Sequence, residues 1–249
     1  VYKNNEMELC WAYDGIAEVY RAMKKATKAE QFERKAMDVA YNNIVTNFMD
    51  LSSLDRASYW NKYSSIFTSW YPNYYIESKA KDASELYNKT ALFAKGILLN
   101  AETEMSKLIL KSGDNASMEK YYNMLRNKTL LSTISSSQTS FSQSFIDSIR
   151  NENVHYEREL IKECKAFGDY TKSMRMSWKD VQSSLKPTDI AVEFIAFPII
   201  DEYGQGSKKA YAALTLKKNS KAPQYIYLCD ESEIDSLKDL NLSSNALYN

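Results

Sequence analysis

The chain has 249 residues, of which 44% are hydrophobic and 26% are charged, and its 32 basic residues are balanced by 32 acidic ones. This composition is typical of a globular protein, and the balanced charge argues against nucleic-acid and anionic-membrane partners. No run of about 18 apolar residues is present, so we expect no membrane-spanning helix. Three widely spaced cysteines and a single histidine predict neither a disulfide framework nor a zinc site, and fit a reducing compartment such as the cytoplasm.

The N-terminal part predicts two helices, from Glu6 to Ala26 and from Lys28 to Met49. In each of them apolar residues recur every three or four positions, the spacing of one helix face. The residues expected to face inward are Leu9, Ala12, Ile16, Val19 and Met23, then Phe32, Ala36, Val39 or Ala40, Asn43 and Phe48. The order of large and small residues resembles a degenerate tetratricopeptide repeat, a pair of antiparallel helices. The residues that carry this resemblance are Trp11, Gly15, Tyr20, Ala29, Phe32 and Ala36.

Aromatic side chains are concentrated between Leu51 and Ile76. Four of them follow helical spacing, which favours packing between helices. A carbohydrate- or peptide-binding aromatic face is the alternative interpretation. Pro72 is expected to end this helix near Tyr71, because a proline disfavours helical geometry in the residue before it. The four aromatic residues are Tyr59, Tyr63, Phe67 and Trp70.

The longest uninterrupted periodic segment runs from Ala83 to Ser112. Apolar or small residues recur there in steps of three or four, and a second stripe widens the apolar face. We therefore expect a central helix that is buried among other helices and ends at Gly113. The two stripes are Ala83, Leu86, Thr90, Ala94, Ile97, Ala101, Met105 and Leu108, and Tyr87, Ala91, Leu98 and Ile109.

Two further helical patterns, Ser117–Thr133 and Phe141–Phe167, are separated by a serine-rich turn at Ser132–Ser140. They predict a long antiparallel hairpin with a coiled-coil-like seam and charged outer faces. The seam is expected to contain Met118, Tyr121, Leu125 and Thr129, and Phe141, Phe145, Ile149, Tyr156, Leu160 and Cys164.

After Ser177 the spacing of apolar residues changes from three or four to two. Ser177 and Asp180 resemble a capping box that opens a short helix, and Asp230 with Glu233 is expected to cap another. Between these helices we expect three strands, the first mostly buried, that pair antiparallel in sequence order because their connections are short. The strands are Ile190–Phe197, Ala210–Leu216 and Gln224–Leu228.

A thiol–imidazole dyad would have to use the only histidine, His155, in the middle of the predicted helix Phe141–Phe167. Cys164 lies nine residues further on, about 13 Å along the helix, which is too far for a hydrogen bond. Cys229 ends a predicted strand, but it precedes any strand that could carry a partner histidine. Acidic residues are expected on charged helix faces, which gives no support to paired-carboxylate catalysis. We therefore predict no catalytic residues, no metal ligands and no cofactor.

The segment ALFAKGILLN, residues 91–100, resembles the LFxKGLLLxS helix that precedes the peptidase module of bacterial CHAT-domain proteins, caspase-like proteins associated with tetratricopeptide repeats. Residues 178–197 resemble the start of that module, WxDVQxxLxPxxxAVEFxxF, in spacing as well as residue type. The resemblance covers nearly the whole chain, and it implies a cysteine peptidase whose catalytic segments, similar to HxxxHG and SACxTG, do not occur here. The matching residues are Trp178, Asp180, Val181, Gln182, Leu185, Pro187, Ala191, Val192, Glu193, Phe194 and Phe197.

We expect a mostly helical protein with a small C-terminal α+β piece. Its predicted regions are tetratricopeptide-like helices at 1–112, a helical hairpin at 113–176, and an incomplete CHAT-like domain at 177–249, truncated before the catalytic residues. The resemblance implies a non-catalytic scaffold whose helical region binds a regulatory protein and whose sheet edge permits self-association. The alternative is a stand-alone helical adaptor for protein–protein interaction. An exposed apolar strand face and edge would favour the peptidase interpretation, whereas a covered sheet would favour the adaptor.

Overall fold

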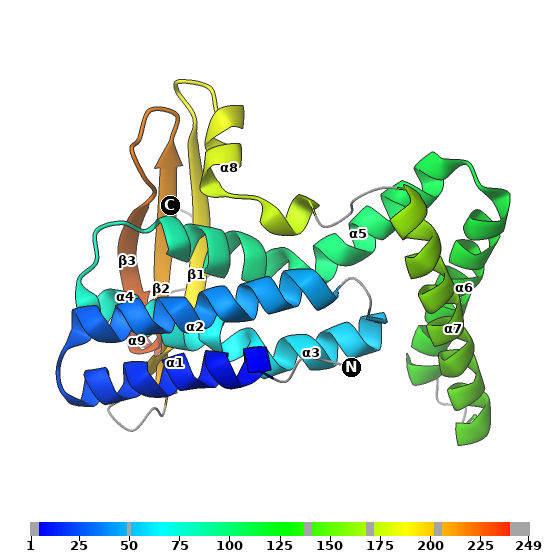
Figure 1. Ribbon diagram of the computed structural model, residues 1–249, viewed down its shortest axis with the longest axis horizontal. Coiled ribbons are helices and arrows are strands. Elements are labelled where there is room, and N and C mark those ends of the chain that lie inside the picture. Colours follow the sequence, from blue (N-terminus) through cyan, green and yellow to red (C-terminus); the bar gives the residue numbers. More distant parts are fainter. Residues whose placement is uncertain (1–4, 49–50, 137–140, 168–171, 202–205, 240–249) are drawn as a thin grey trace. The chain divides into compact units, whose positions relative to one another are not determined.

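The computed structural model describes residues 5–48, 51–136, 141–167, 172–201 and 206–239. As expected, the protein is mostly helical and has a three-stranded sheet near its C-terminus (Figure 1). The chain forms two compact units, each built from segments that are far apart in the sequence. The first unit contains residues 1–42, 62–95 and 176–249, and the second contains residues 43–61 and 96–175.

The first unit begins with the helix pair α1 (Asn5–Ala22) and α2 (Ala26–Asn47). Lys24, with a φ of 57°, closes the tight turn between them. The face predicted for α1 is wrong: its predicted inward stripe is exposed, and the smaller Cys10 and Ala17 are buried instead. Small residues let two helix backbones approach closely, which leaves the larger side chains of α1 outside the contact. The buried alanines of α2 are Ala29, Ala36 and Ala40.

The next helical stretch consists of α3 (Ser53–Ser65), the π-helical segment η2 (Ile66–Trp70) and α4 (Tyr71–Ser78). The prediction that Pro72 ends the helix is wrong. The wider π-helical turn lies directly before the proline, where a regular helix would need the missing N–H. The packing interpretation of the aromatic residues is confirmed, since most are buried. The buried ones are Trp60, Tyr63, Phe67, Tyr71, Tyr74 and Tyr75.

The predicted central helix is present as the π-helical segment η3 (Leu86–Ala94) followed by α5 (Lys95–Ser112). Its first half belongs to the first unit, where the Thr90 hydroxyl donates a hydrogen bond to the Phe67 carbonyl at 2.8 Å. From Gly96 onward it belongs to the second unit. The predicted stripes are buried at Ala83, Leu86, Tyr87, Thr90, Ala91, Ile97, Met105 and Ile109, whereas the side chains of Leu98 and Ala101 lie outside the described ones.

The sheet of the first unit has the order β1 (Ile190–Ile200), β2 (Gly206–Lys217), β3 (Gln224–Asp230), with both pairs antiparallel as predicted. The short helix α8 (Trp178–Ser184) precedes the sheet, and α9 (Glu231–Asp239) follows it. Both predicted capping boxes are confirmed, because Ser177 and Asp180 bond reciprocally, as do Asp230 and Glu233.

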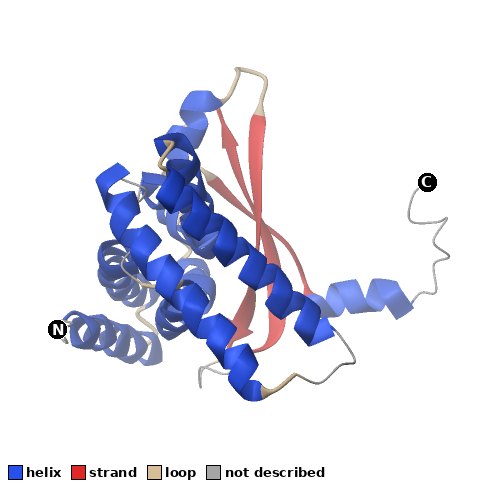
Figure 2. Ribbon diagram, turned by 90° about the vertical axis from the view of Figure 1, so that its right-hand side faces the viewer, coloured by secondary structure: helices blue, strands red, loops and turns tan. Residues whose placement is uncertain are grey.

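One face of the sheet, whose three strands are drawn in red in Figure 2, is buried against helices of the same unit. We call this the inner face, formed by Ile195, Phe197, Ala212, Leu214 and Leu216. The segments η2, α4 and η3 pack against β1. Two helical side chains fix the end of β1: Asn73 bonds to Pro198 and Ile200, and Arg21 donates to the carbonyls of Ile200 and Asp201.

The second unit contains the predicted hairpin, formed by α6 (Asn115–Ser136) and α7 (Gln143–Phe167). Polar pairs cross between the two helices, including Lys120 with Glu159 and Glu163. The predicted seam is confirmed at Ile149 and Leu160 but is wrong at other positions, because α6 carries apolar residues on more than one face. The predicted seam residues that are exposed are Leu125, Thr129, Phe141 and Phe145, and the side chain of Cys164 lies outside the described ones.

Candidate interaction surfaces

The first candidate surface is the outer face of the sheet, formed by Ile190, Val192, Phe194 and Ile226. The expectation that β1 is mostly buried is therefore wrong for every second residue. Phe194 is 65% exposed, whereas Phe197 on the inner face is only 2% exposed. The register places Phe194 opposite Ala213 and Ala213 opposite Ile226, so the apolar face continues across all three strands. Contiguous apolar surface of this kind marks a site where another structure packs.

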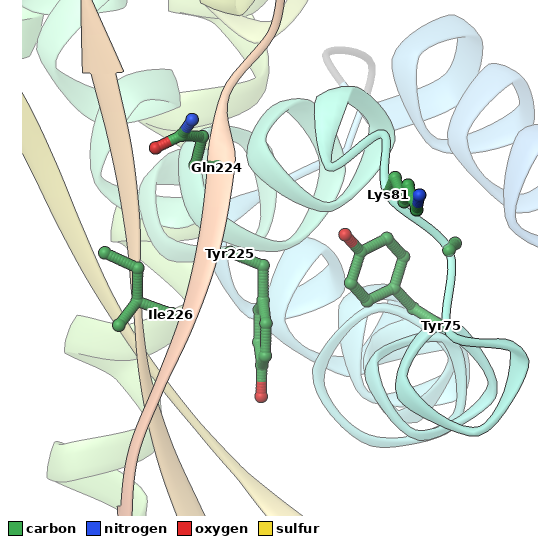
Figure 3. Close-up of a pocket in the computed structure, with 6 residues that line it drawn as sticks. Tyr75, Lys81, Gln224, Tyr225 and Ile226 are labelled. Atoms are coloured by element: carbon green, nitrogen blue, oxygen red, sulfur yellow. The ribbon is translucent and has the colours of Figure 1, made fainter.

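The second candidate surface is the edge strand β3 and the pocket beside it (Figure 3). In the described sheet β3 pairs only with β2, so every second residue of β3 turns its backbone N–H and C=O away from the sheet. A pocket of about 290 Å³ lies against this strand. It is lined by Tyr75, Ala80, Lys81, Gln224, Tyr225 and Ile226.

The two tyrosine rings of this pocket lie 5.6 Å apart between centroids, one from α4 and one from β3. Burial raises the pKa of each hydroxyl to about 12, so both tyrosines are protonated at neutral pH. Within the described part of the chain, neither the Tyr75 hydroxyl nor the Lys81 ammonium has a hydrogen-bond partner. The pocket therefore offers two donors and an aromatic wall.

The third candidate surface is the exposed stripe of α1, formed by Leu9, Ile16, Val19 and Met23, which are 39% to 58% exposed. Gly15 lies among these residues, and a Cβ atom added to it would meet nothing within 4 Å. A glycine inside a helix costs about 1 kcal/mol relative to alanine. Packing within the described chain gives no reason for this glycine, whereas a helix that crosses α1 closely would.

A buried acidic pair is the polar feature that the sequence interpretation missed. Glu33 is fully buried, and neither of its carboxylate oxygens has a hydrogen-bond partner within the described residues; the same holds for Asp14 Oδ1 and the Tyr74 hydroxyl. Burial, and then the charge of Asp14, raises the pKa of Glu33 well above its usual range. Periodicity could have indicated Glu33, since it neighbours the inward positions Phe32 and Ala36 on α2. The expectation that all acidic residues lie on charged outer faces is wrong here.

The single histidine and the cysteines Cys10 and Cys229 have different environments. The His155 side chain is 68% exposed on α7 and pairs with Glu159 at 3.4 Å. The Cys10 thiol is buried, donates to the Ala36 carbonyl, and has its pKa raised to about 12 by burial and by Glu33 and Asp14, which disfavours a thiolate. Cys229 lies at the end of β3, as predicted. His155 belongs to the second unit, while Cys10 and Cys229 belong to the first.

Among the described residues, no group of three or more histidine, cysteine or acidic side chains is arranged to hold a metal ion. None of the described helices is both long and apolar enough to cross a membrane.

Comparisons with protein-family models, with curated proteins and with solved structures give no match to this chain.

Proposed function

We propose that this chain is the non-catalytic helical scaffold and leading edge of a CHAT-type module, in a protein whose complete form is a caspase-like cysteine peptidase. In this proposal the helical region binds or senses a regulatory protein. The observation that carries it is the exposed apolar outer face of the sheet, because an apolar sheet face is normally covered by a second layer. The rest of a peptidase domain would supply that layer.

A contact between the two motif segments supports the proposal. Lys95, from ALFAKGILLN, forms an ion pair with Glu193, from the AVEF segment, at 2.5 Å, and it also donates to the Phe194 carbonyl. The N–H of Trp178, at the start of the second motif, donates to Asn88 at 2.7 Å. Lys95 and Glu193, one from each motif, therefore join the central helix to the sheet, as expected if both motifs belong to one module.

The encoded sequence after Asn249 provides the first test. We expect segments similar to HxxxHG and SACxTG, at strand ends, in the complete protein. Thiol-dependent cleavage of a peptide library by that protein, lost when the cysteine of the second segment becomes alanine, is the expected activity. A complete protein without either segment would contradict the peptidase part of the proposal.

The outer face itself is tested by Phe194→Ser, with Phe197→Ser as the matched control. Phe194 is 65% exposed, so its substitution should change the melting temperature of this 249-residue chain by less than about 2 °C, the shift expected for 0.5 kcal/mol. In the complete protein the same substitution should lower the melting temperature and the peptidase activity. Phe197→Ser should destabilise both forms, because Phe197 is buried. An equal tolerance of Phe194→Ser in both forms would show that nothing covers this face.

The α1 stripe favours a second candidate, a helical adaptor for protein–protein interaction without peptidase chemistry. An apolar helix face with an unexplained glycine suits a partner helix. In this candidate, Val19→Glu should abolish capture of the partner, while Phe194→Ser should leave it unchanged. The peptidase proposal requires in addition that Phe194→Ser affects the complete protein.

A further inference from the structure

We propose that the edge of β3 binds an extended peptide of a partner protein, which adds a fourth strand to the sheet and places an acidic side chain in the Tyr75–Tyr225 pocket. This inference rests on β3 and its pocket, and it does not depend on the peptidase proposal. It names a site that uses backbone groups for affinity and a pocket for specificity.

Strand addition first requires an edge strand with unpaired backbone groups, and β3 is such a strand. In Figure 1, β3 lies at the outside of the sheet, and in the described part of the chain β2 is the only strand that pairs with it. An antiparallel edge strand presents unpaired N–H and C=O groups at every second residue. An extended peptide satisfies these groups with its own backbone, and this mode of recognition is independent of peptide sequence.

Specific binding of one peptide also requires a site that selects a side chain, and the pocket beside β3 provides it. Side chains of an added strand alternate between the two faces of the sheet, so those on the inner side pass the pocket beside Tyr225, which pairs with the inner-face residue Leu214. The volume of about 290 Å³ accommodates one long side chain together with water. The two tyrosine rings provide apolar walls for its methylene groups.

The chemistry of the pocket favours an acceptor with negative charge. Figure 3 shows the Tyr75 hydroxyl directed into the space between Tyr225 and Lys81. Its raised pKa keeps that hydroxyl protonated, so it can donate a hydrogen bond. Lys81 is exposed and can pair with a carboxylate. The nearby carboxylate of Asp82 accepts the Ser84 N–H at 2.9 Å, and among the described residues Lys81 forms neither an ion pair nor a hydrogen bond with its side chain.

A partner peptide fits these observations better than a second copy of this chain. Two β3 strands paired edge to edge would bring two Lys81 side chains to one interface, and Asp230, the acidic residue of β3, already accepts hydrogen bonds from the Ser232 hydroxyl and the Glu233 N–H at the start of α9. The exposed residues of β3 are Gln224, Ile226, Tyr227 and Leu228, none of which is acidic. The occupant we infer is therefore an extended segment with a glutamate.

The experiment uses the 249-residue chain and fluorescein-labelled nine-residue peptides of alternating threonine and valine, with glutamate, glutamine or leucine at the fifth position. Fluorescence anisotropy should show the glutamate peptide binding about fivefold to tenfold more tightly than the other two. Lys81→Ala should remove that preference, and Tyr75→Phe should reduce it. Lys221→Ala, an exposed lysine in the turn between β2 and β3, should leave it unchanged.

Strand addition is tested with two versions of the glutamate peptide, N-methylated at alternate sets of residues. Only the set that faces β3 should abolish binding, and hydrogen exchange should slow in residues 224–230 when the unmodified peptide is bound. Equal affinity of the glutamate and glutamine peptides would overturn the inference, as would equal effects of the two methylated sets. Sedimentation that shows dimers of the chain alone, with the same protection of residues 224–230, would assign the edge to a second copy and also overturn it.

Discussion

The carboxyl group of Glu33 is buried beside Asp14, and burial determines which charge state it takes. Protonation of Glu33 avoids placing two neighbouring negative charges in the contact between α1 and α2. Cys10 and Tyr74 lie close to the pair, and both have raised pKa values for the same reason, burial first and then the carboxylates. The acidic pair therefore makes the α1–α2 contact sensitive to pH.

The sign of this effect follows from the raised pKa of Glu33. The folded protein holds a proton that the unfolded chain releases near pH 4.3, so the stabilisation is complete below that pH. It is lost as the pH rises through the pKa of the folded state. Glu33→Gln keeps a neutral side chain at all pH values. We expect it to raise the melting temperature at pH 8 and to flatten the decline in stability between pH 5 and pH 9.

Differential scanning calorimetry at several pH values measures this effect. Glu8→Gln, which neutralises an exposed carboxylate on α1, serves as the control and should leave the pH profile unchanged. A Glu33→Gln variant with the same decline as the wild-type protein would show that Glu33 is ionised in the folded state.

The ion pair of Arg56 with Glu157 is the second buried charge feature, at 2.6 Å, with both side chains at most 4% exposed. It joins α3 to α7 within the second unit. Glu157→Ala leaves a buried guanidinium without its carboxylate, and we expect a loss of about 3–5 kcal/mol in the free energy of unfolding. Arg56→Met combined with Glu157→Leu should recover most of this loss, because no isolated charge remains. Urea unfolding of the single and double variants measures the difference.

At the scale of elements, Asn73 connects α4 to the end of β1. Its amide donates to the carbonyls of Ser69 and Pro198, each at 2.8 Å, and accepts from the Ile200 N–H at 3.2 Å. Asn73→Ala removes the partner of the buried Ile200 N–H and of the part-buried Pro198 carbonyl, at a total of about 2 kcal/mol. We expect a melting temperature lower by about 4–8 °C, on the scale of 2–4 °C per kcal/mol. Asn219→Ala, in the exposed turn between β2 and β3, should change it by less than about 2 °C.

The elements that the sequence predicts well are those set by local chemistry. The capping boxes at Ser177 and Asp230 define their helix starts, and period-two spacing with short turns defines the three antiparallel strands. The inward face of α1 could not be predicted, because it carries apolar residues on two faces and the smaller ones make the contact. The continuation of the helix through Pro72 depends on a π-helical turn that no residue preference indicates.

The candidate surfaces were predictable only in part. The sequence indicates that β1 is apolar on both faces, but it does not tell which face a neighbouring layer covers. The pocket at β3 brings Tyr75 and Lys81 together with Tyr225, about 150 residues later in the chain, and only the fold provides that proximity. Lys95 and Glu193 are 98 positions apart, and their contact likewise exists only because of the fold.

At the scale of the whole molecule, the first unit joins N-terminal helices to a C-terminal sheet, and this makes the two parts dependent on each other. The inner face of the sheet, with Phe197 and Leu214 buried, is covered by helical segments from residues 62–95. Three strands with open edges do not fold readily without such a layer. The domain boundary predicted at residue 177 therefore separates two parts that depend on each other for folding.

We expect Ser177–Asn249 expressed alone to be unfolded or aggregated, because its inner face loses its covering helices. Val1–Ser173 should remain helical and soluble, because helices satisfy their own backbone hydrogen bonds, but it should bind an apolar dye through the surface that the sheet no longer covers. Co-expression of the two pieces should abolish that dye binding and restore a complex of one copy each. Circular dichroism and sedimentation measure these outcomes. A C-terminal piece that is monomeric and unfolds cooperatively would contradict the prediction, since the sheet would then be stable without any helix from residues 62–95.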